Sequence, residues 1–166
     1  MKLNTYQTRY TIMVQSTKLL IFLSACFLSF SSFGQLSALT EAEVREIAAT
    51  ENENQLVMRA SNLTQEGYLY FAEILVDRLL QINPSSSNYN YRKGFLCLDI
   101  RKDYVQAIPF LEKAVTDTDP NYDMYSTKEQ SAANDALFHL GACYHLNEEI
   151  DKAELYYNKF KEVSKK

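Results

Sequence analysis

The sequence is poor in the residues that interrupt helices and contains no tryptophan. Its 166 residues include only 4 Gly and 3 Pro. An all-β chain of this length needs many turns, so the low counts favour an α-helical fold. Three cysteines are too few for a small domain held together by disulfides. A net charge of −4 provides no basic surface for nucleic acid.

Hydrophobic and aromatic residues, by contrast, are abundant. They include 12 Tyr and 9 Phe and bring the hydrophobic share to 46%. This supply is enough for a buried core and argues against an intrinsically disordered chain. The length fits one globular domain and is too short for two of ordinary size. We therefore expect one folded unit that is mainly helical.

Acidic residues are missing from the first forty positions, where the charged residues are Lys2, Arg9 and Lys18. An uncharged and mostly apolar run of 15 residues follows at 19–33. As a helix, this run would measure about 22 Å, which is shorter than the roughly 30 Å hydrocarbon core of a bilayer. A basic flank followed by a short apolar run is typical of a secretory signal peptide.

We predict that this signal peptide spans residues 1–34, with Met13 as an alternative start. The small residues Ser32 and Gly34 favour cleavage between Gly34 and Gln35. Cleavage removes three basic residues and no acid, so the net charge changes from −4 to −7. The mature chain is then exported into an oxidising compartment.

A cleaved signal peptide that leaves an unlipidated chain is not the only interpretation, and two alternatives remain open. Residues 23–26 read Leu-Ser-Ala-Cys, which resembles a bacterial lipobox with Cys26 as the lipidated residue. A lipoprotein normally turns polar after this cysteine, whereas Phe27 and Leu28 keep the run apolar. The second alternative is a leader that stays uncleaved as an anchor. We expect association with a membrane only in these two cases.

A helical repeat pattern is clearest near the C-terminal end of the sequence. It consists of Leu137, Leu140, Gly141, Tyr144, Ala153 and Tyr157. The order matches W-x2-L-G-x2-Y…A-x3-F, with Leu in place of Trp and Tyr in place of Phe. The small residues Gly141 and Ala153 allow two antiparallel helices to approach closely, and the larger side chains fill the space beside this contact.

Similar spacings occur upstream, with one longer interval. Gly94 precedes Ala107 by 13 residues, and Ala107 lies 35 residues after Ala72. This second distance is close to the roughly 34-residue period of the pattern. Ala107 and Ala153, however, are 46 residues apart. The excess falls in residues 117–130, whose Pro, Asn and Asp content predicts an inserted loop.

The predicted architecture is all-α. The expected helices span about 41–50, 53–66, 68–82, 88–101, 104–117, 131–146 and 150–164. Thr40 and Glu43 predict a capping box at the start of the first helix, and Ser126 and Glu129 predict one for the helix at 131–146.

Three predicted repeats follow an N-terminal capping helix and linker. The capping helix and linker occupy residues 35–52, and the repeats occupy about 53–86, 87–120 and 134–166.

Together these residues resemble tetratricopeptide repeat (TPR) proteins over about 53–164. The resemblance implies about three helix-turn-helix repeats stacked into a short right-handed solenoid. Two segments carry a closer likeness, namely residues 90–94 with 107–115 and residues 135–147. Both resemble the TPR head of envelope proteins that continue into β-propeller repeats and an OmpA-like peptidoglycan-binding domain. That family is associated with type IX secretion and gliding in Gram-negative bacteria, which implies a periplasmic protein close to the outer membrane.

The sequence ends at Lys166, soon after the last predicted repeat. Two expectations therefore stay open: a stand-alone head, or the N-terminal fragment of an OmpA-like peptidoglycan-tethering structural protein. Apolar residues of the last helix are expected to form an end that a partner or a following domain covers. These residues are Ile150, Leu155, Tyr156, Phe160 and Val163.

The resemblance also implies a protein-binding groove, because the first helix of each TPR repeat lines a concave surface. Alignment of the repeats gives its candidate residues as Asn54, Val57, Ser61, Asn88, Tyr91, Phe95, Asp135, Phe138 and His145. This mixture would suit a peptide with apolar anchors and a hydrogen-bonding main chain. The alternative for Phe95 and Phe138 is packing against their neighbours.

Catalytic and metal-binding signatures are absent from the sequence. It has no Gly-rich phosphate loop, no G-x-S-x-G and no H-E-x-x-H. His139 and Cys143 share a helix face but lack a third ligand of recognisable spacing, so we predict no metal site. Cys97 and Cys143 take equivalent places on neighbouring helices, but the strict geometry of a disulfide argues against a bond between them.

We therefore expect a non-enzymatic scaffold in the bacterial cell envelope, linked through the resemblance to the outer-membrane and type IX secretion machinery. Its expected partners are envelope proteins or peptide segments. We expect no cofactor, no nucleic acid and no small-molecule substrate.

Overall fold

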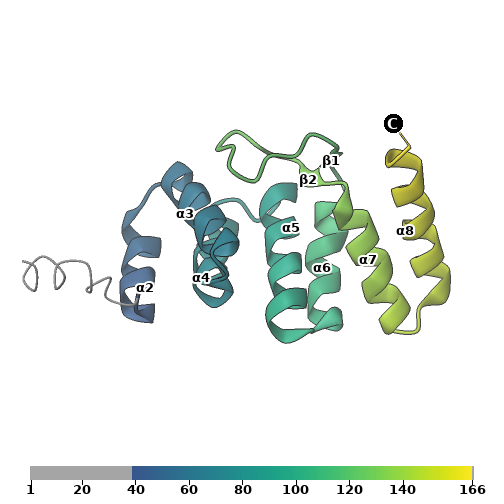
Figure 1. Cartoon of the computed structure of the whole chain (residues 1–166), viewed down its shortest axis with the longest axis horizontal. Coiled ribbons are helices and arrows are strands. Elements are labelled where there is room, and N and C mark those ends of the chain that lie inside the picture. Colours follow the sequence, from purple (N-terminus) through teal and green to yellow (C-terminus); the bar gives the residue numbers. More distant parts are fainter. Residues whose placement is uncertain (1–38, 166) are drawn as a thin grey trace, which may run out of the picture. The chain divides into compact units, whose positions relative to one another are not determined.

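The computed structural model describes residues 39–165, so the predicted signal peptide, lipobox and anchor lie outside the described residues. The described chain is all-α apart from one very short strand pair (Figure 1). Its α-helices are α2 (Glu41–Thr50), α3 (Glu53–Gln65), α4 (Leu69–Ile82), α5 (Ser87–Leu96), α6 (Tyr104–Ala114), α7 (Asp135–Leu146) and α8 (Ile150–Val163). The predicted all-α class is confirmed.

Consecutive helices pack as antiparallel hairpins, α3 with α4, α5 with α6 and α7 with α8 (Figure 1). Two glycines sit where the helices of a hairpin touch. A Cβ atom on Gly94 would lie 2.7 Å from Leu111 Cδ2, and one on Gly141 would lie 2.8 Å from Tyr157 Cδ1. Real Cβ atoms do not approach other atoms so closely, because the cores of proteins are already densely packed. The glycines therefore set the distance between the paired helices.

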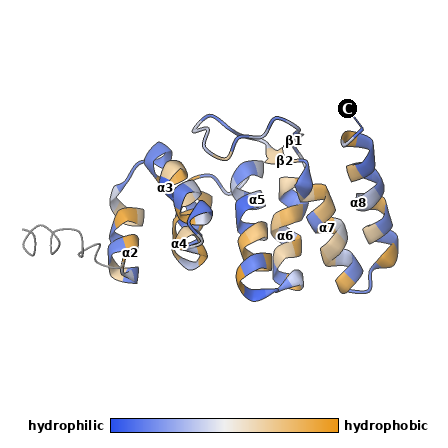
Figure 2. Cartoon of the chain, in the orientation of Figure 1, coloured by the Kyte–Doolittle hydropathy of each residue, from blue (hydrophilic) through white to orange (hydrophobic). Residues whose placement is uncertain are grey.

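The hydrophobic core runs between these hairpins. Ala60 is buried, and so are Ala72, Ala107 and Ala153 of the repeat spacing. Figure 2 shows hydrophobic positions gathered on α6 and α7, whereas the connection between these two helices is mostly hydrophilic. Packing of α7 against both α6 and α8 forms an apolar cluster that includes Leu111, Leu140, Tyr144 and Ala153.

The start of α2 confirms the predicted capping box. The Thr40 backbone N–H donates to Glu43 Oε2 at 2.8 Å, and the Glu43 N–H donates to Thr40 Oγ1 at 3.3 Å. These two bonds satisfy N–H groups that the first turn of a helix leaves free. α2 packs on α4, in the position of a cap on the first hairpin.

The predicted start of the helix at 131–146 is wrong, because α7 begins at Asp135. Residues Ala132–Ala133 form strand β2, which pairs in parallel with strand β1 (Thr118–Asp119). This pairing keeps the backbone extended where the helix was expected. Ser126 does not cap a helix, because its Oγ accepts from the Lys128 N–H at 3.3 Å within a local turn.

Helix α5 changes its winding at its end. Cys97–Arg101 form a π-turn, η1, which ends at Lys102 with a left-handed backbone (φ 53°). The predicted helix at 88–101 is therefore α-helical only to Leu96. A π-turn shifts the direction of the side chains that follow it, and Arg101 here points toward Glu73 of α4.

Helix α7 covers part of the apolar surface of the last helix, α8, and leaves part of it exposed. Tyr156 stacks on Tyr144 of α7 at a centroid distance of 5.7 Å, and Phe160 lies 5.6 Å from Phe138. α7 thus covers Tyr156 and Phe160, two of the apolar residues that were expected to lie exposed at the C-terminal end of the stack. Ile150 and Leu155 remain 54% and 49% exposed. Among residues 39–165, no helix combines the length and apolar character needed to cross a bilayer.

Candidate functional site

The candidate site lies where the insert (residues 117–130) folds back onto α3 and α5 (Figure 1). Asn88 binds the insert twice. Its backbone N–H donates to the Gln130 carbonyl at 3.1 Å, and its side-chain Nδ2 donates to the Glu129 carbonyl at 2.9 Å. Because Asn88 lies in the first turn of α5, the insert also satisfies an N–H that the helix leaves free.

Arg92 forms the centre of this contact. It is only 7% exposed, and its guanidinium donates to Asn88 Oδ1 at 2.8 Å, to Ser61 Oγ at 2.9 Å and to the Met124 carbonyl. The Ser61 hydroxyl also lies 2.5 Å from the Met124 carbonyl oxygen. No ion pair found within residues 39–165 includes Arg92. Neutral oxygens therefore compensate this buried positive charge.

Tyrosine side chains complete the contact. The ring of Tyr122 meets the ring of Tyr91 edge to face, with centroids 5.5 Å apart, and the Tyr122 hydroxyl donates to Asn88 Oδ1 at 3.0 Å. Burial raises the pKa of both phenols, so both stay protonated near neutral pH. The Tyr125 hydroxyl donates to Gln65 Oε1 at the end of α3.

A small apolar pocket of about 170 Å³ opens beside the docked insert. Its lining comes from α3, α5 and the insert: Thr64, Tyr91, Arg92, Phe95, Leu96, Tyr122 and Met124. A cavity of about 150 Å³ can hold a benzene ring. The pocket thus has room for one aromatic or branched aliphatic side chain.

An aromatic surface adjoins this pocket and consists of Phe95, Phe138 and His139. His139 lies 6.1 Å from Phe95 and 6.0 Å from Phe138, and it also stacks on Tyr91 at 6.4 Å. Burial lowers the pKa of His139, while the nearby Asp135 carboxylate partly opposes this shift. Phe138 is 45% exposed, so it packs against its neighbours and still presents part of its ring to solvent.

The structure divides the predicted groove residues into three groups. Ser61 and Asn88 are buried beneath the insert, and Val57 is buried among the helices, so none of the three faces an open groove. Tyr91, Phe95 and Phe138 are brought together around His139. Asn54, Asp135 and His145 are exposed. For Ser61 and Asn88 the correction has a physical reason: the insert covers the surface that the alignment of repeats treats as open.

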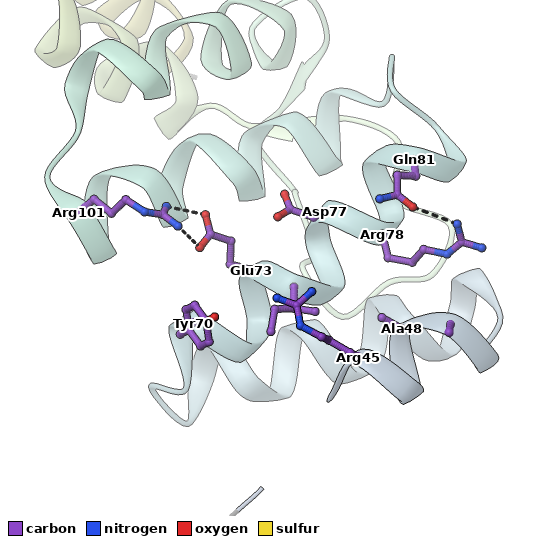
Figure 3. Close-up of a pocket in the computed structure, with 10 residues that line it drawn as sticks. Arg45, Ala48, Tyr70, Glu73, Asp77, Arg78, Gln81 and Arg101 are labelled. Carbon is purple, nitrogen blue, oxygen red and sulfur yellow. Dashed lines mark hydrogen bonds and ion pairs between the residues drawn. The ribbon is translucent and has the colours of Figure 1, made fainter. Parts of the chain in front are cut away.

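A larger hollow of about 680 Å³ lies between α2, α4 and Arg101 of η1 (Figure 3). Its floor is built around Glu73, which is 4% exposed. Glu73 receives two bonds from Arg101, at 2.6 and 2.5 Å, and one from Lys93 at 2.9 Å. Lys93 also lies 2.5 Å from Asp77. Glu73 and Asp77 pair with Lys93 and Arg101, so we assign these four charges to joining α4 with α5 and η1.

The environment of Glu73 determines how it titrates. Burial by itself raises the pKa of this carboxyl, but the hydrogen bonds from Arg101 and Lys93 outweigh burial and lower the pKa overall. Glu73 is therefore ionised at neutral pH. A buried carboxylate with two cationic partners is a stable structural element rather than a proton donor.

The two cysteines of the described chain are buried free thiols. Burial raises the pKa of Cys143 to about 11 and also raises the pKa of Cys97. Thiols with raised pKa values are poor nucleophiles, because the thiolate is the reactive form. His139 lies among aromatic rings, and no group of three or more potential metal ligands occurs in residues 39–165.

The repeat pattern does not single out Arg92, Tyr122 and Met124 as functional residues. One signal was available for Arg92, because it follows Asn88 by four residues and so shares its helix face. The insert also carries three large side chains among its turn residues, Tyr122, Met124 and Tyr125. Such residues in a loop indicate a segment that docks onto the fold.

In comparisons with known proteins, no family model matches the chain, and no curated protein sequence matches it.

Proposed function

We propose that the chain is a non-enzymatic protein-interaction scaffold of the TPR class. The support is the order of its helical hairpins, in which Gly94 and Gly141 set close helix contacts at nearly the same distance before Ala107 and Ala153. Stacked helix-turn-helix units of this kind present extended surfaces for other proteins. The short solenoid and the three repeats belong to this proposal.

The aromatic surface is the observation that carries the proposal. Phe138 exposes nearly half of its area beside Phe95 and His139, and the apolar pocket opens next to them. Aromatic residues beside a small apolar pocket are typical of binding hot spots, where an anchor side chain of the partner is buried. We propose that envelope proteins or their peptide segments bind here.

The proposed location is the periplasm, close to the outer membrane. The N-terminal sequence supports export, and the resemblance to envelope proteins of type IX secretion suggests the machinery that the scaffold serves. In this setting the protein would hold partners together without chemical turnover.

A capture experiment tests the proposal. The exported chain is immobilised, incubated with a solubilised envelope fraction of the same bacterium, and compared with the double variant Phe95→Ala, Phe138→Ala. We expect the double variant to lose at least about 90% of captured partner, because hot-spot truncations typically cost 2 kcal/mol or more.

The matched control is Met58→Ala, Val105→Ala, which removes two exposed apolar side chains elsewhere. It should capture as much partner as the unmodified chain. Circular dichroism of all three proteins checks that the helices are intact. Equal capture by the Phe95, Phe138 double variant would show that the partner binds another surface.

A further inference from the structure

The insert is bound to the helices mainly through its main chain. The carbonyl groups of Met124, Glu129 and Gln130 accept bonds from Arg92 and from both N–H groups of Asn88. Main-chain carbonyl groups are the same in every residue, so their recognition does not depend on the identity of the side chains. Capture of main-chain groups, with pockets for a few side chains adding specificity, is a recurring way in which proteins bind peptides.

Aromatic side chains give this contact its anchors. Tyr122 is held by ring contact with Tyr91 and by its hydroxyl on Asn88, and Tyr125 reaches Gln65 three residues later. Met124, between them, contributes its carbonyl to Arg92 and its side chain to the apolar pocket. The docked insert therefore has the features of a bound peptide: aromatic anchors and captured carbonyls.

The receiving surface is built from the helices and not from the insert. Ser61 belongs to α3, while Asn88 and Arg92 belong to α5. Arg92 is positioned by Asn88 and Ser61 through bonds that do not involve the insert. Release of the insert would leave donors of Arg92 and Asn88 oriented together but without their carbonyl partners, whereas the Ser61 hydroxyl keeps the Val57 carbonyl at 2.8 Å. Such unpaired donors favour binding of another chain with carbonyl groups.

The two ends of the insert meet, so it can leave without moving the helices. Thr118 pairs with Ala132 and Asp119 with Ala133, and the Ala132 N–H donates to the Asp117 carbonyl at 2.9 Å. The residues between Asp119 and Ala132 therefore form a loop whose two ends are joined by the strand pair. Displacement is therefore a local opening, which costs less than unfolding of a helix.

We propose that the insert is an internal, displaceable ligand, and that the α3–α5 face (Ser61, Asn88 and Arg92) binds a peptide segment of a partner protein that forms turns as the insert does. The matching segment has an aromatic residue at the place of Tyr122 and an accessible main-chain carbonyl two residues later. This inference rests on the proposed function, because both require a partner protein, but it assigns the α3–α5 face, which meets Phe95 at the apolar pocket and does not include Phe138.

The test uses a variant in which residues 120–130 are replaced by a short Gly-Ser linker, which the meeting ends at Thr118 and Ala132 can accommodate. The probe is a fluorescent synthetic peptide with the sequence of residues 118–131, followed by fluorescence anisotropy. We expect saturable binding to the shortened variant. Binding to the intact chain should be at least about ten-fold weaker, because the tethered insert competes at millimolar effective concentration.

Matched controls define specificity. A peptide with Tyr122→Ala, and the shortened variant with Arg92→Met, should each bind at least about ten-fold more weakly, since each loses an anchor of the contact. A folded shortened variant that does not bind the peptide would overturn the inference. Equal binding to the intact chain would also overturn it, because the peptide would then occupy some other surface.

A second measurement covers the case in which the shortened variant does not fold. On the intact chain, an excess of the unlabelled peptide carrying Lys128→Gln, which trypsin does not cut, should displace the insert and accelerate tryptic cleavage of the chain after Lys128 by about five-fold or more. An unchanged cleavage rate would contradict the inference. Capture of envelope partners through Phe95 and Phe138 would be unaffected by that outcome, so the two proposals fail separately.

Discussion

Two neighbouring residues of α5 carry buried positive charges in different surroundings. Lys93 faces α4, where Glu73 and Asp77 provide carboxylates at 2.9 and 2.5 Å. Arg92 faces α3 and the insert, where its partners are an amide oxygen, a hydroxyl and a main-chain carbonyl. One helix thus forms an ionic contact on one side and a neutral hydrogen-bonded contact on the other.

This difference indicates which of the two contacts, that of Lys93 or that of Arg92, can exchange its hydrogen-bond partner. Removing one member of a buried ion pair leaves an uncompensated charge, and this makes the α4–α5 contact costly to open. A carbonyl group on Arg92 can be replaced by another carbonyl with little change in energy. The Glu73 cluster therefore holds the hairpins together, whereas the Arg92 cluster can release one segment and accept another.

Glu73→Ala breaks the ionic side and should have the largest effect. It leaves Arg101 and Lys93 without their shared carboxylate, although Lys93 keeps Asp77. We expect the free energy of unfolding to fall by about 2–4 kcal/mol, measured by urea denaturation with circular dichroism. The control Asp99→Ala, at an exposed pair with Lys102, should cost less than about 1 kcal/mol. Equal losses in the two variants would contradict the structural role of Glu73.

Arg92→Met tests the neutral side, because it keeps the length of the side chain and removes its donors. We expect a loss of about 1–2 kcal/mol in the free energy of unfolding. Tryptic cleavage after Lys128 should accelerate by about ten-fold, since 1.4 kcal/mol of local opening is a factor of ten. Mass spectrometry of the released peptide measures the rate. Glu73→Ala should leave this cleavage rate unchanged under native conditions, and a matching acceleration would erase the contrast between the two sides.

Ser61→Ala removes one hydroxyl from the neutral side, which lies beside the Met124 carbonyl and also accepts from Arg92. The Met124 carbonyl keeps its bond from Arg92, so we expect a loss of about 0.5–1 kcal/mol and a two- to three-fold increase in cleavage after Lys128. Thr127→Ala, within the insert itself, serves as the control for side-chain removal near the cleavage site. An effect of Ser61→Ala as large as that of Arg92→Met would mean that the hydroxyl, rather than the guanidinium, holds the insert.

His139 should give a smaller, pH-dependent effect. Burial lowers its pKa in the folded protein, so the unfolded chain binds a proton more readily. Stability is therefore full above the unfolded pKa, near 6.5, and falls as the pH decreases below it. The urea midpoint should decrease between pH 7 and pH 5.5, and this decrease should be smaller in His139→Phe. The control His145→Phe, at an exposed position, should keep the full decrease; an identical pH profile for His139→Phe would contradict the assignment.

The helices could be predicted from the sequence because their signals are local. Thr40 and Glu43 defined the start of α2, and the small residues Gly94 and Gly141 marked close helix contacts. The start of α7 was predicted wrongly, because the pairing of Ala132 with Thr118 is not visible as a local pattern. Two-residue strands have no periodicity that a sequence can reveal.

The candidate site was only partly predictable. Tyr91, Phe95 and Phe138 were expected on one surface from the spacing of the repeats, and aromatic contacts with His139 join them. The burial of Ser61 and Asn88 could not be foreseen, because it depends on where a distant loop docks. Ser61 and Met124 are 63 residues apart in the sequence, and only the folded chain brings them together.

The short strand pair β1–β2 holds the two ends of the insert together, because Thr118 pairs with Ala132 and Asp119 with Ala133. This pairing affects how the sequence of the protein can change in evolution. A loop with joined ends can gain, lose or exchange residues while the helices on either side keep their positions. New recognition properties could therefore arise from changes confined to a single short stretch of the gene. The helices would keep their stability, and only the insert between the two strands would change in sequence.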